Sequence, residues 1–191
     1  MVCWVTAAEV RLIAMAIPRV TEEILQDLER FARKTAEVWQ QAGLIKKNSF
    51  GVQLNLADAY GGFRSVASFH HSDPEAEHDG RWYVENANGK NIVCELTRLD
   101  SHEGVRLYQG VLAGVDGVFP WGGAIIDLAY GLIIGTSGFK EDEDILFSRT
   151  LRNYLVMLLD RAGQASLDEA RQRGEQKGEP GADRFTRAAV A

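Results

Sequence analysis

The histidines are the residues of this 191-residue chain whose side chains most readily bind a metal or a cofactor. Three of the four, His70, His71 and His78, fall in one polar stretch that also holds Asp73 and Asp79. Imidazole nitrogens and carboxylate oxygens together suit a transition metal, so this stretch could hold one. No helical or CxxH-type spacing fixes the geometry of these side chains, however. The spacing therefore favours solvated loop residues, and no metal site is predicted.

A second group of polar side chains could bind a carboxylate. Arg81 and Arg98 offer guanidinium forks that pair with both oxygens of a carboxylate, and Lys90 offers a point charge beside the amide of Asn91. Solvated surface positions explain the same four residues equally well. Aromatic residues that could line a pocket or an oligomer contact are Trp82, Tyr83, Phe119 and Trp121. Buried packing is nevertheless the usual role of such side chains.

The chain shows no arrangement typical of a hydrolase. Ser137 lies in the run Gly-Thr-Ser-Gly at 135–138, which is not a GxSxG elbow, and no base stands at a recognisable motif spacing from it. The backbone N–H groups of that run could bind an anion, but the acidic residues 141–144 that follow would repel phosphate. Cys94 lies in an apolar segment and is predicted to be packed rather than nucleophilic. Catalytic residues therefore stay unassigned.

Composition narrows the class of protein. The net charge is −6 and the pI about 5.3, which disfavours nucleic acid and anionic membranes as partners. No stretch is apolar enough to span a membrane, and Glu9 and Arg11 interrupt the apolar start of the chain, which argues against a signal peptide. The two cysteines, Cys3 and Cys94, lie too far apart for a zinc motif and fit a reducing compartment. We expect a cytoplasmic protein.

The first half of the chain predicts a helix followed by a hairpin. Thr21 is a typical N-cap, and apolar residues recur at helical spacing until Gly43. From Phe50 to Leu56 apolar and polar residues alternate as in a half-buried strand, and the turn at 57–62 leads to a returning strand, Phe63–Phe69. Residues 70–81 are predicted to form an exposed loop.

The second half repeats this plan. Residues 85–100 suit either a helix or a strand, and their composition favours the helix. A glycine-rich connection, 110–123, leads to a hairpin with strands 122–128 and 131–136, and a helix is predicted over 141–161. The expected fold class is α+β, an antiparallel sheet covered by helices. The domain is predicted at 21–162, between an N-terminal extension, 1–20, with a short helix and a flexible C-terminal tail, 163–191.

Several landmarks resemble the GlcG/HbpS-like haem-degrading-domain family. They are Asp-Ala-Tyr-Gly-Gly at 58–62, Asp-Gly-Arg-Trp at 79–82, Lys90-Asn91, Ser101, Gly-Gly-Ala-Ile-Ile-Asp at 122–127, the glycine and Ser-Gly pattern at 131–138, and Glu143-Asp144. Their order resembles that of a small, largely uncharacterised subgroup and covers residues 21 to about 160. The chain departs from the pattern at Ala124, where the family has Pro, and at Ile145, where the subgroup has His.

The resemblance implies a profilin-like α/β/α sandwich, assembly into a homo-oligomer, and binding of haem or a related tetrapyrrole. The ligand-binding residues that we predict on this basis are His70, His71, His78, Arg81, Trp82, Lys90, Asn91 and Ser137. If the subunits form a cleft between them, we expect it near the 70–91 segment and the 121–138 hairpin. The alternative is a non-enzymatic oligomeric assembly or partner-binding module without a cofactor, which the Ile145 departure favours.

Overall fold

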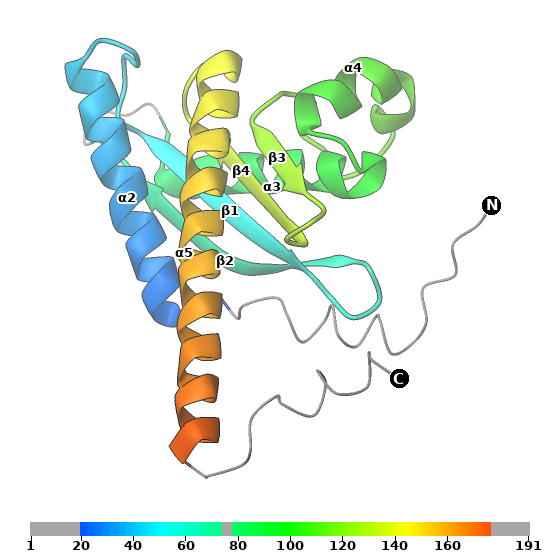
Figure 1. Cartoon of the computed structure of the whole chain (residues 1–191). Coiled ribbons are helices and arrows are strands. Elements are labelled where there is room, and N and C mark those ends of the chain that lie inside the picture. The colour runs from blue at the N-terminus through cyan, green and yellow to red at the C-terminus, as the bar shows by residue number, and fades with distance from the viewer. Residues whose placement is uncertain (1–19, 74–77, 177–191) are drawn as a thin grey trace. The chain divides into compact units, whose positions relative to one another are not determined.

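The computed structural model describes residues 20–73 and 78–176, so the short helix predicted near the N-terminus lies outside the described residues (Figure 1). The chain divides into a compact unit, Val20–Val156, and a second unit to which the described residues 157–176 belong. We call Val20–Val156 the core unit, and the site below lies entirely within it.

Helix α2 (Glu22–Gln41) begins and ends where the sequence predicts. Thr21 is its N-cap, and the Thr21 side-chain oxygen accepts a hydrogen bond from the N–H of Ile24 at 3.3 Å. Glu22 and Glu23 in the first turn interact favourably with the positive end of the helix dipole.

Four antiparallel strands form one sheet in the order β2-β1-β4-β3. Their bounds are β1 (Phe50–Ala57), β2 (Phe63–His71), β3 (Ala124–Asp127) and β4 (Leu132–Ser137). Because β1 pairs with both β2 and β4, the first hairpin is joined to the second through the centre of the sheet. Both predicted hairpins are confirmed.

The sheet of the core unit lies between two helical layers (Figure 1). Helix α3 (Gly80–Thr97) covers one face, and α2 with the first turns of α5 covers the other. On the α5 side the ring of Phe50 lies 5.2 Å from that of Phe147, and on the α3 side the Asn91 amide donates to the Gln53 carbonyl at 3.0 Å. The predicted α+β fold with helices on both faces of an antiparallel sheet is confirmed.

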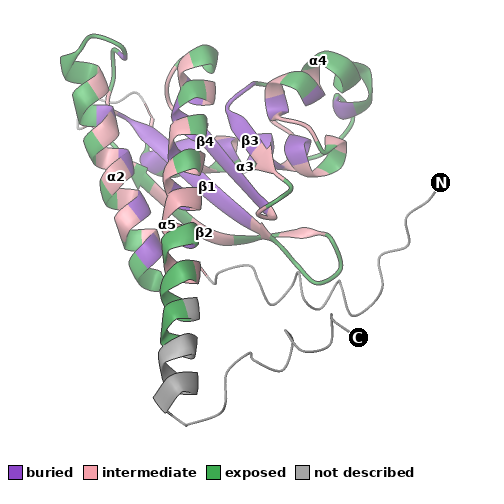
Figure 2. Ribbon diagram, in the orientation of Figure 1, coloured by how far each residue is buried: buried purple, intermediate pink, exposed green. Residues whose placement is uncertain are grey.

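Strand β1, at the centre of the sheet, is buried on both faces, which corrects the prediction of a half-buried strand from Phe50 to Leu56. Figure 2 shows β1 and β4 buried between helices whose outer faces are exposed. Phe50, Val52 and Leu54 are fully buried, and each such side chain stabilises the fold by about 1.5–3 kcal/mol. The alternating Gln53 and Asn55 are buried as well, because α3 covers them and hydrogen bonds satisfy their amides.

Helix α4 (Ser101–Leu112) follows α3 directly, and the sequence alone predicts no element over its residues 101–109. The two helices are separated at Arg98, which adopts a left-handed φ of +59° where a glycine would be the usual signal. At its start, the Asp100 and Ser101 side chains accept hydrogen bonds from Ile126 and Ala124 N–H. These bonds satisfy donors of the edge strand β3.

Helix α5 (Glu141–Gln176) extends well beyond the predicted end at 161, and residues 163–176 are helical rather than part of a loose tail. Gly163 costs only about 1 kcal/mol relative to alanine in a helix, and the residues after it are mostly good helix formers. A hydrogen bond from Gln164 to Asp168 links successive turns. Among the described residues, no helix combines the length and apolar character needed to cross a membrane.

Candidate functional site

A pocket of about 230 Å³ opens in the core unit where α3, the segment before β3 and the start of α5 meet. It is lined by Trp82, Tyr83, Lys90, Phe119, Trp121, Gly122, Ser137, Gly138, Phe139, Glu141 and Asp144. Part of this lining comes from the 70–91 segment and the 121–138 hairpin, where a cleft between subunits is expected, and the cleft between subunits stays a prediction. The pocket lining combines five aromatic side chains with three charged ones.

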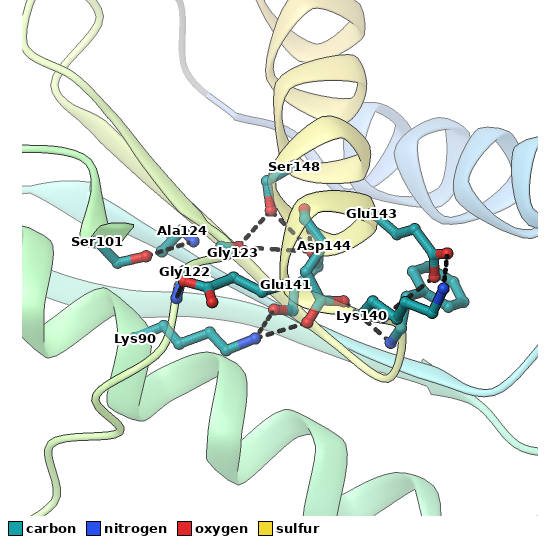
Figure 3. Close-up of polar contacts among 12 residues, drawn as sticks. Lys90, Ser101, Gly122, Gly123, Ala124, Lys140, Glu141, Glu143, Asp144 and Ser148 are labelled. Atoms are coloured by element: carbon teal, nitrogen blue, oxygen red, sulfur yellow. Dashed lines mark hydrogen bonds and ion pairs between the residues drawn. The ribbon is translucent and has the colours of Figure 1, made fainter. Parts of the chain in front are cut away.

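A buried ion pair forms the polar part of the pocket. Lys90 Nζ lies 2.7 Å from Asp144 Oδ2, and both side chains are almost fully buried. The same ammonium donates to the Thr136 carbonyl at 2.9 Å and lies 5.9 Å from the centre of the Phe119 ring. Lys90 comes from α3 and Asp144 from α5, so the pair connects the two helical layers past the end of the sheet (Figure 3).

The electrostatics of Asp144 are set by opposing effects. The pKa of Asp144 is raised from 3.8 to about 7, because burial raises it by more than the charge and hydrogen bond of Lys90 and the N–H of Phe139 lower it. The charge of the neighbouring Glu143 acts in the same direction as burial. A carboxyl group with a pKa near neutrality can gain or lose a proton at physiological pH, which is typical of functional sites.

Two adjacent glycines make room for these charged groups. A Cβ on Gly123 would lie 2.8 Å from both Lys90 Nζ and the Asp144 Cβ, and the φ of +124° disfavours any other residue there. Gly122 donates its N–H to Glu141 Oε1 at 2.7 Å and leaves space for that side chain. The two glycines therefore place the 122–123 backbone against both carboxylates.

Hydrogen bonds on the α5 side also fix the backbone of residues 122–123 in place. Ser148 Oγ donates to the Gly123 carbonyl at 2.6 Å and lies 2.9 Å from Thr136 Oγ1. Thr136 Oγ1 also lies 2.8 Å from the Asp144 carbonyl oxygen, to which it can donate. Because these groups are buried and paired, the base of the pocket belongs to the folded core rather than to a surface loop.

Three of the residues predicted from the sequence line the pocket: Trp82, Lys90 and Ser137. Asn91 adjoins Lys90 on α3, but its amide donates to the Gln53 carbonyl and the Asn55 Oδ1 atom beneath the helix. Arg81 is exposed, and its backbone N–H bonds to the capping Asp79. Neither Asn91 nor Arg81 lines the pocket.

The structure separates the three predicted histidines. His70 and His71 belong to strand β2, not to a loop, and successive strand residues point to opposite faces of the sheet. The His70 ring accordingly lies against Gly80 at the start of α3, whereas His71 Nδ1 lies 2.9 Å from the Arg33 guanidinium. His78 alone adjoins the pocket, with its ring 4.1 Å from that of Trp82.

Sequence reasoning misses the acidic side of the pocket. The pattern at Glu141 and Asp144 is that of a helix start, and nothing in the sequence pairs Asp144 with Lys90, 54 positions earlier. Glu141 and Asp144 are three positions apart and therefore lie on one face of α5, which is the only local sign that they could act together. Phe139, between the Ser-Gly turn and the helix, likewise carries no signal of its own.

Two other predictions concern reactive side chains. Cys94 is fully buried, and burial raises the pKa of its thiol well above the ordinary value, so the predicted packing role is confirmed. Among residues 20–73 and 78–176, no group of three His, Cys, Asp or Glu side chains is arranged to hold a metal ion.

Comparisons with known proteins give one similar structure. No protein-family model matches the sequence, and no curated protein matches it either. The chain is similar to the crystal structure of Klebsiella pneumoniae protein ORFY, described as a DUF336 protein, with 15% sequence identity and a TM-score of 0.47. The match covers 72% of this chain and 90% of ORFY.

Proposed function

We propose that this chain binds a small planar aromatic molecule in the pocket between α3 and the start of α5. The observation that carries the proposal is an aromatic pocket that ends on a buried ion pair. A buried ion pair is rarely more stabilising than apolar side chains of the same volume, so stability alone gives no reason for Lys90 and Asp144. Polar groups converging in an apolar cavity are what small-molecule sites require.

The aromatic lining supports a planar ligand. Trp82 and Trp121 are 41% and 53% exposed although they line a concave surface. Large aromatic faces left open in this way can stack on a ring, and such stacking contributes about 0.5–1.5 kcal/mol beyond area burial. A cavity of about 150 Å³ accommodates benzene, so the volume here suits one substituted ring or a small fused pair.

Haem, which the sequence resemblance implies, is a separate proposal. The pocket does not fit haem, because its volume is too small for four pyrrole rings and its lining offers no imidazole, thiol or thioether, only the phenol of Tyr83, as an axial ligand. The one described imidazole beside the pocket is His78. If haem binds through it, a Soret shift on titration should vanish in His78→Ala and persist in His70→Ala and His71→Ala. A titration without a Soret shift would exclude haem and would leave the proposal of a small aromatic ligand unaffected.

The aromatic-ligand proposal is tested with one- and two-ring compounds such as indole, phenol and quinoline. Chemical-shift changes in protein NMR spectra would locate binding at the Trp82 and Trp121 indole N–H signals. We expect Trp121→Ala to weaken binding about tenfold, which corresponds to the loss of one stacking partner. Tyr60→Ala is the matched control, since Tyr60 is 97% exposed and does not line the pocket. Absence of binding, or equal loss in both variants, would contradict the proposal.

A second candidate function is assembly through α4, either instead of ligand binding or together with it. Exposed apolar side chains gather on this helix and the turn after it: Leu107, Tyr108, Val111 and Val115. Such clustering is a feature of contact surfaces between proteins. Light scattering should then report a homo-oligomer that Val111→Asp dissociates, with Leu128→Asp, also at an exposed apolar position, as the control. A monomeric wild-type protein would exclude this function.

A further inference from the structure

The charges that line the pocket indicate which aromatic molecules it selects, an inference that rests on the proposed function. The charged groups are Lys90, Asp144 and Glu141. With Asp144 ionised the lining is net negative, and with Asp144 protonated it is neutral. In neither state is the lining net positive, so an anionic ligand finds no uncompensated charge of opposite sign there.

The single cation of the lining is already engaged. Two of the three Lys90 N–H donors point to the Asp144 carboxylate and the Thr136 carbonyl. A negatively charged ligand would have to displace a carboxylate 2.7 Å away to pair with this ammonium. Lys90 therefore neutralises Asp144 and does not provide a free anion site.

Glu141 is positioned to receive a positive charge. Its Oε1 atom is held by the Gly122 N–H at 2.7 Å, which fixes the carboxylate on the pocket wall (Figure 3). No ammonium or guanidinium is found paired with Glu141 in the described part of the chain. A fixed carboxylate without a cationic partner attracts cations to its surroundings.

The aromatic side chains of the lining also favour a positively charged ligand. The faces of aromatic rings carry a partial negative charge, and a cation over such a face is stabilised by about 0.5–2 kcal/mol. Trp82, Tyr83 and Trp121 present this property beside Glu141, while Phe119 already lies near the Lys90 ammonium.

A competing positive surface lies next to the pocket but not in it. Lys46, Lys47 and Lys140 line a neighbouring hollow that shares Gly138 and Phe139 with the pocket. Lys140 lies 3.8 Å from Glu143, and none of the three lysines lines the pocket itself.

We propose that the pocket selects planar aromatic molecules that carry a positive charge, such as amidines or protonated nitrogen bases, with Glu141 as the residue that recognises the charge. Three probes of nearly identical shape test this: benzamidine, a cation at neutral pH, benzamide, which is neutral, and benzoate, an anion. Dissociation constants are measured for each by NMR titration of the full chain at pH 8.

We expect benzamidine to bind at least about tenfold more tightly than benzamide, and benzoate to bind most weakly. Glu141→Gln keeps the acceptor for the Gly122 N–H but removes the charge, so it should bring benzamidine to the affinity of benzamide. Asp142→Asn is the matched control, because Asp142 is exposed one position further along α5 and does not line the pocket.

The outcomes separate this inference from the proposed function. Benzoate or benzamide binding as tightly as benzamidine would overturn the charge selection and leave the aromatic pocket standing. An unchanged preference in Glu141→Gln would overturn the role of that residue. If none of the three probes shifts the Trp82 and Trp121 signals, the pocket is not an aromatic site and both proposals fail.

Discussion

At the scale of single residues, the most informative feature is a lysine and an aspartate that share a buried position. Taking two charges out of water costs several kcal/mol per ion, and only the contact between them and their remaining hydrogen bonds offset it. Lys90 has two such partners, and Asp144 accepts from both Lys90 and the Phe139 N–H. Each member of the pair therefore depends on the other.

Removing one member should destabilise the protein more than removing both. We expect Lys90→Met to lower the free energy of unfolding at pH 8 by about 3–5 kcal/mol, because Asp144 is left buried without its partner. The double variant Lys90→Met/Asp144→Leu should recover most of that loss. Urea unfolding measures both, with Lys140→Met, at a 68% exposed position, as a control that changes little. A double variant as unstable as the single one would argue against an isolated pair.

The pH dependence of stability should report the raised pKa of Asp144. The folded protein holds this proton more tightly than the unfolded chain, so the contribution of Asp144 is complete below about pH 4 and is lost as the pH rises through about 7. Relative to Asp144→Asn, the wild-type free energy of unfolding should fall between these values by an amount on the order of 4 kcal/mol.

The measurement is urea unfolding of both proteins at several pH values from 4 to 8. Asp142→Asn serves as the control and should follow the wild type across the range, because its side chain is exposed. A difference between wild type and Asp144→Asn that stays constant or grows with pH would mean that Asp144 is ionised throughout.

At the scale of elements, the turn before β3 controls how closely α3 and α5 approach each other at the pocket. We expect Gly123→Ala to destabilise the protein by more than about 2 kcal/mol, since a Cβ there meets Lys90 and Asp144 and the φ is left-handed. Gly110→Ala is the matched control, because a Cβ there meets nothing within 4 Å and alanine favours the helix. Thermal unfolding compares the two, and equal effects would contradict the packing argument.

The elements were largely predictable because their signals are local. Thr21 marks a helix start, and alternation from Phe50 marks a strand, whatever lies elsewhere in the chain. Three features had no such local signal. The break between α3 and α4 falls at Arg98 instead of a glycine, β2 runs on into His70 and His71, and α5 continues past Gly163.

At the scale of the whole core unit, the site could be predicted only in part because it is assembled from distant segments. Trp82 and Lys90 drew attention through their chemistry, but their relation to Glu141 and Asp144 exists only after α3 and α5 pack on opposite faces of the sheet. Conversely, His70 and His71 are neighbours in sequence and are separated by the thickness of the sheet. For the two histidines, proximity in sequence was misleading, and for the pocket residues of α3 and α5 there was no proximity in sequence to use.

The anchoring of the pocket base by Ser148 and Thr136 has a practical consequence for testing whether the pocket binds a ligand. Because these groups are buried with the helix that also carries Phe147 and Leu151, the cavity disappears when the protein melts. Any compound that occupies it must then raise the melting temperature, by a free energy that grows with the logarithm of its concentration over its dissociation constant. A metabolite library screened by differential scanning fluorimetry therefore tests for a ligand of this pocket whatever its chemical class.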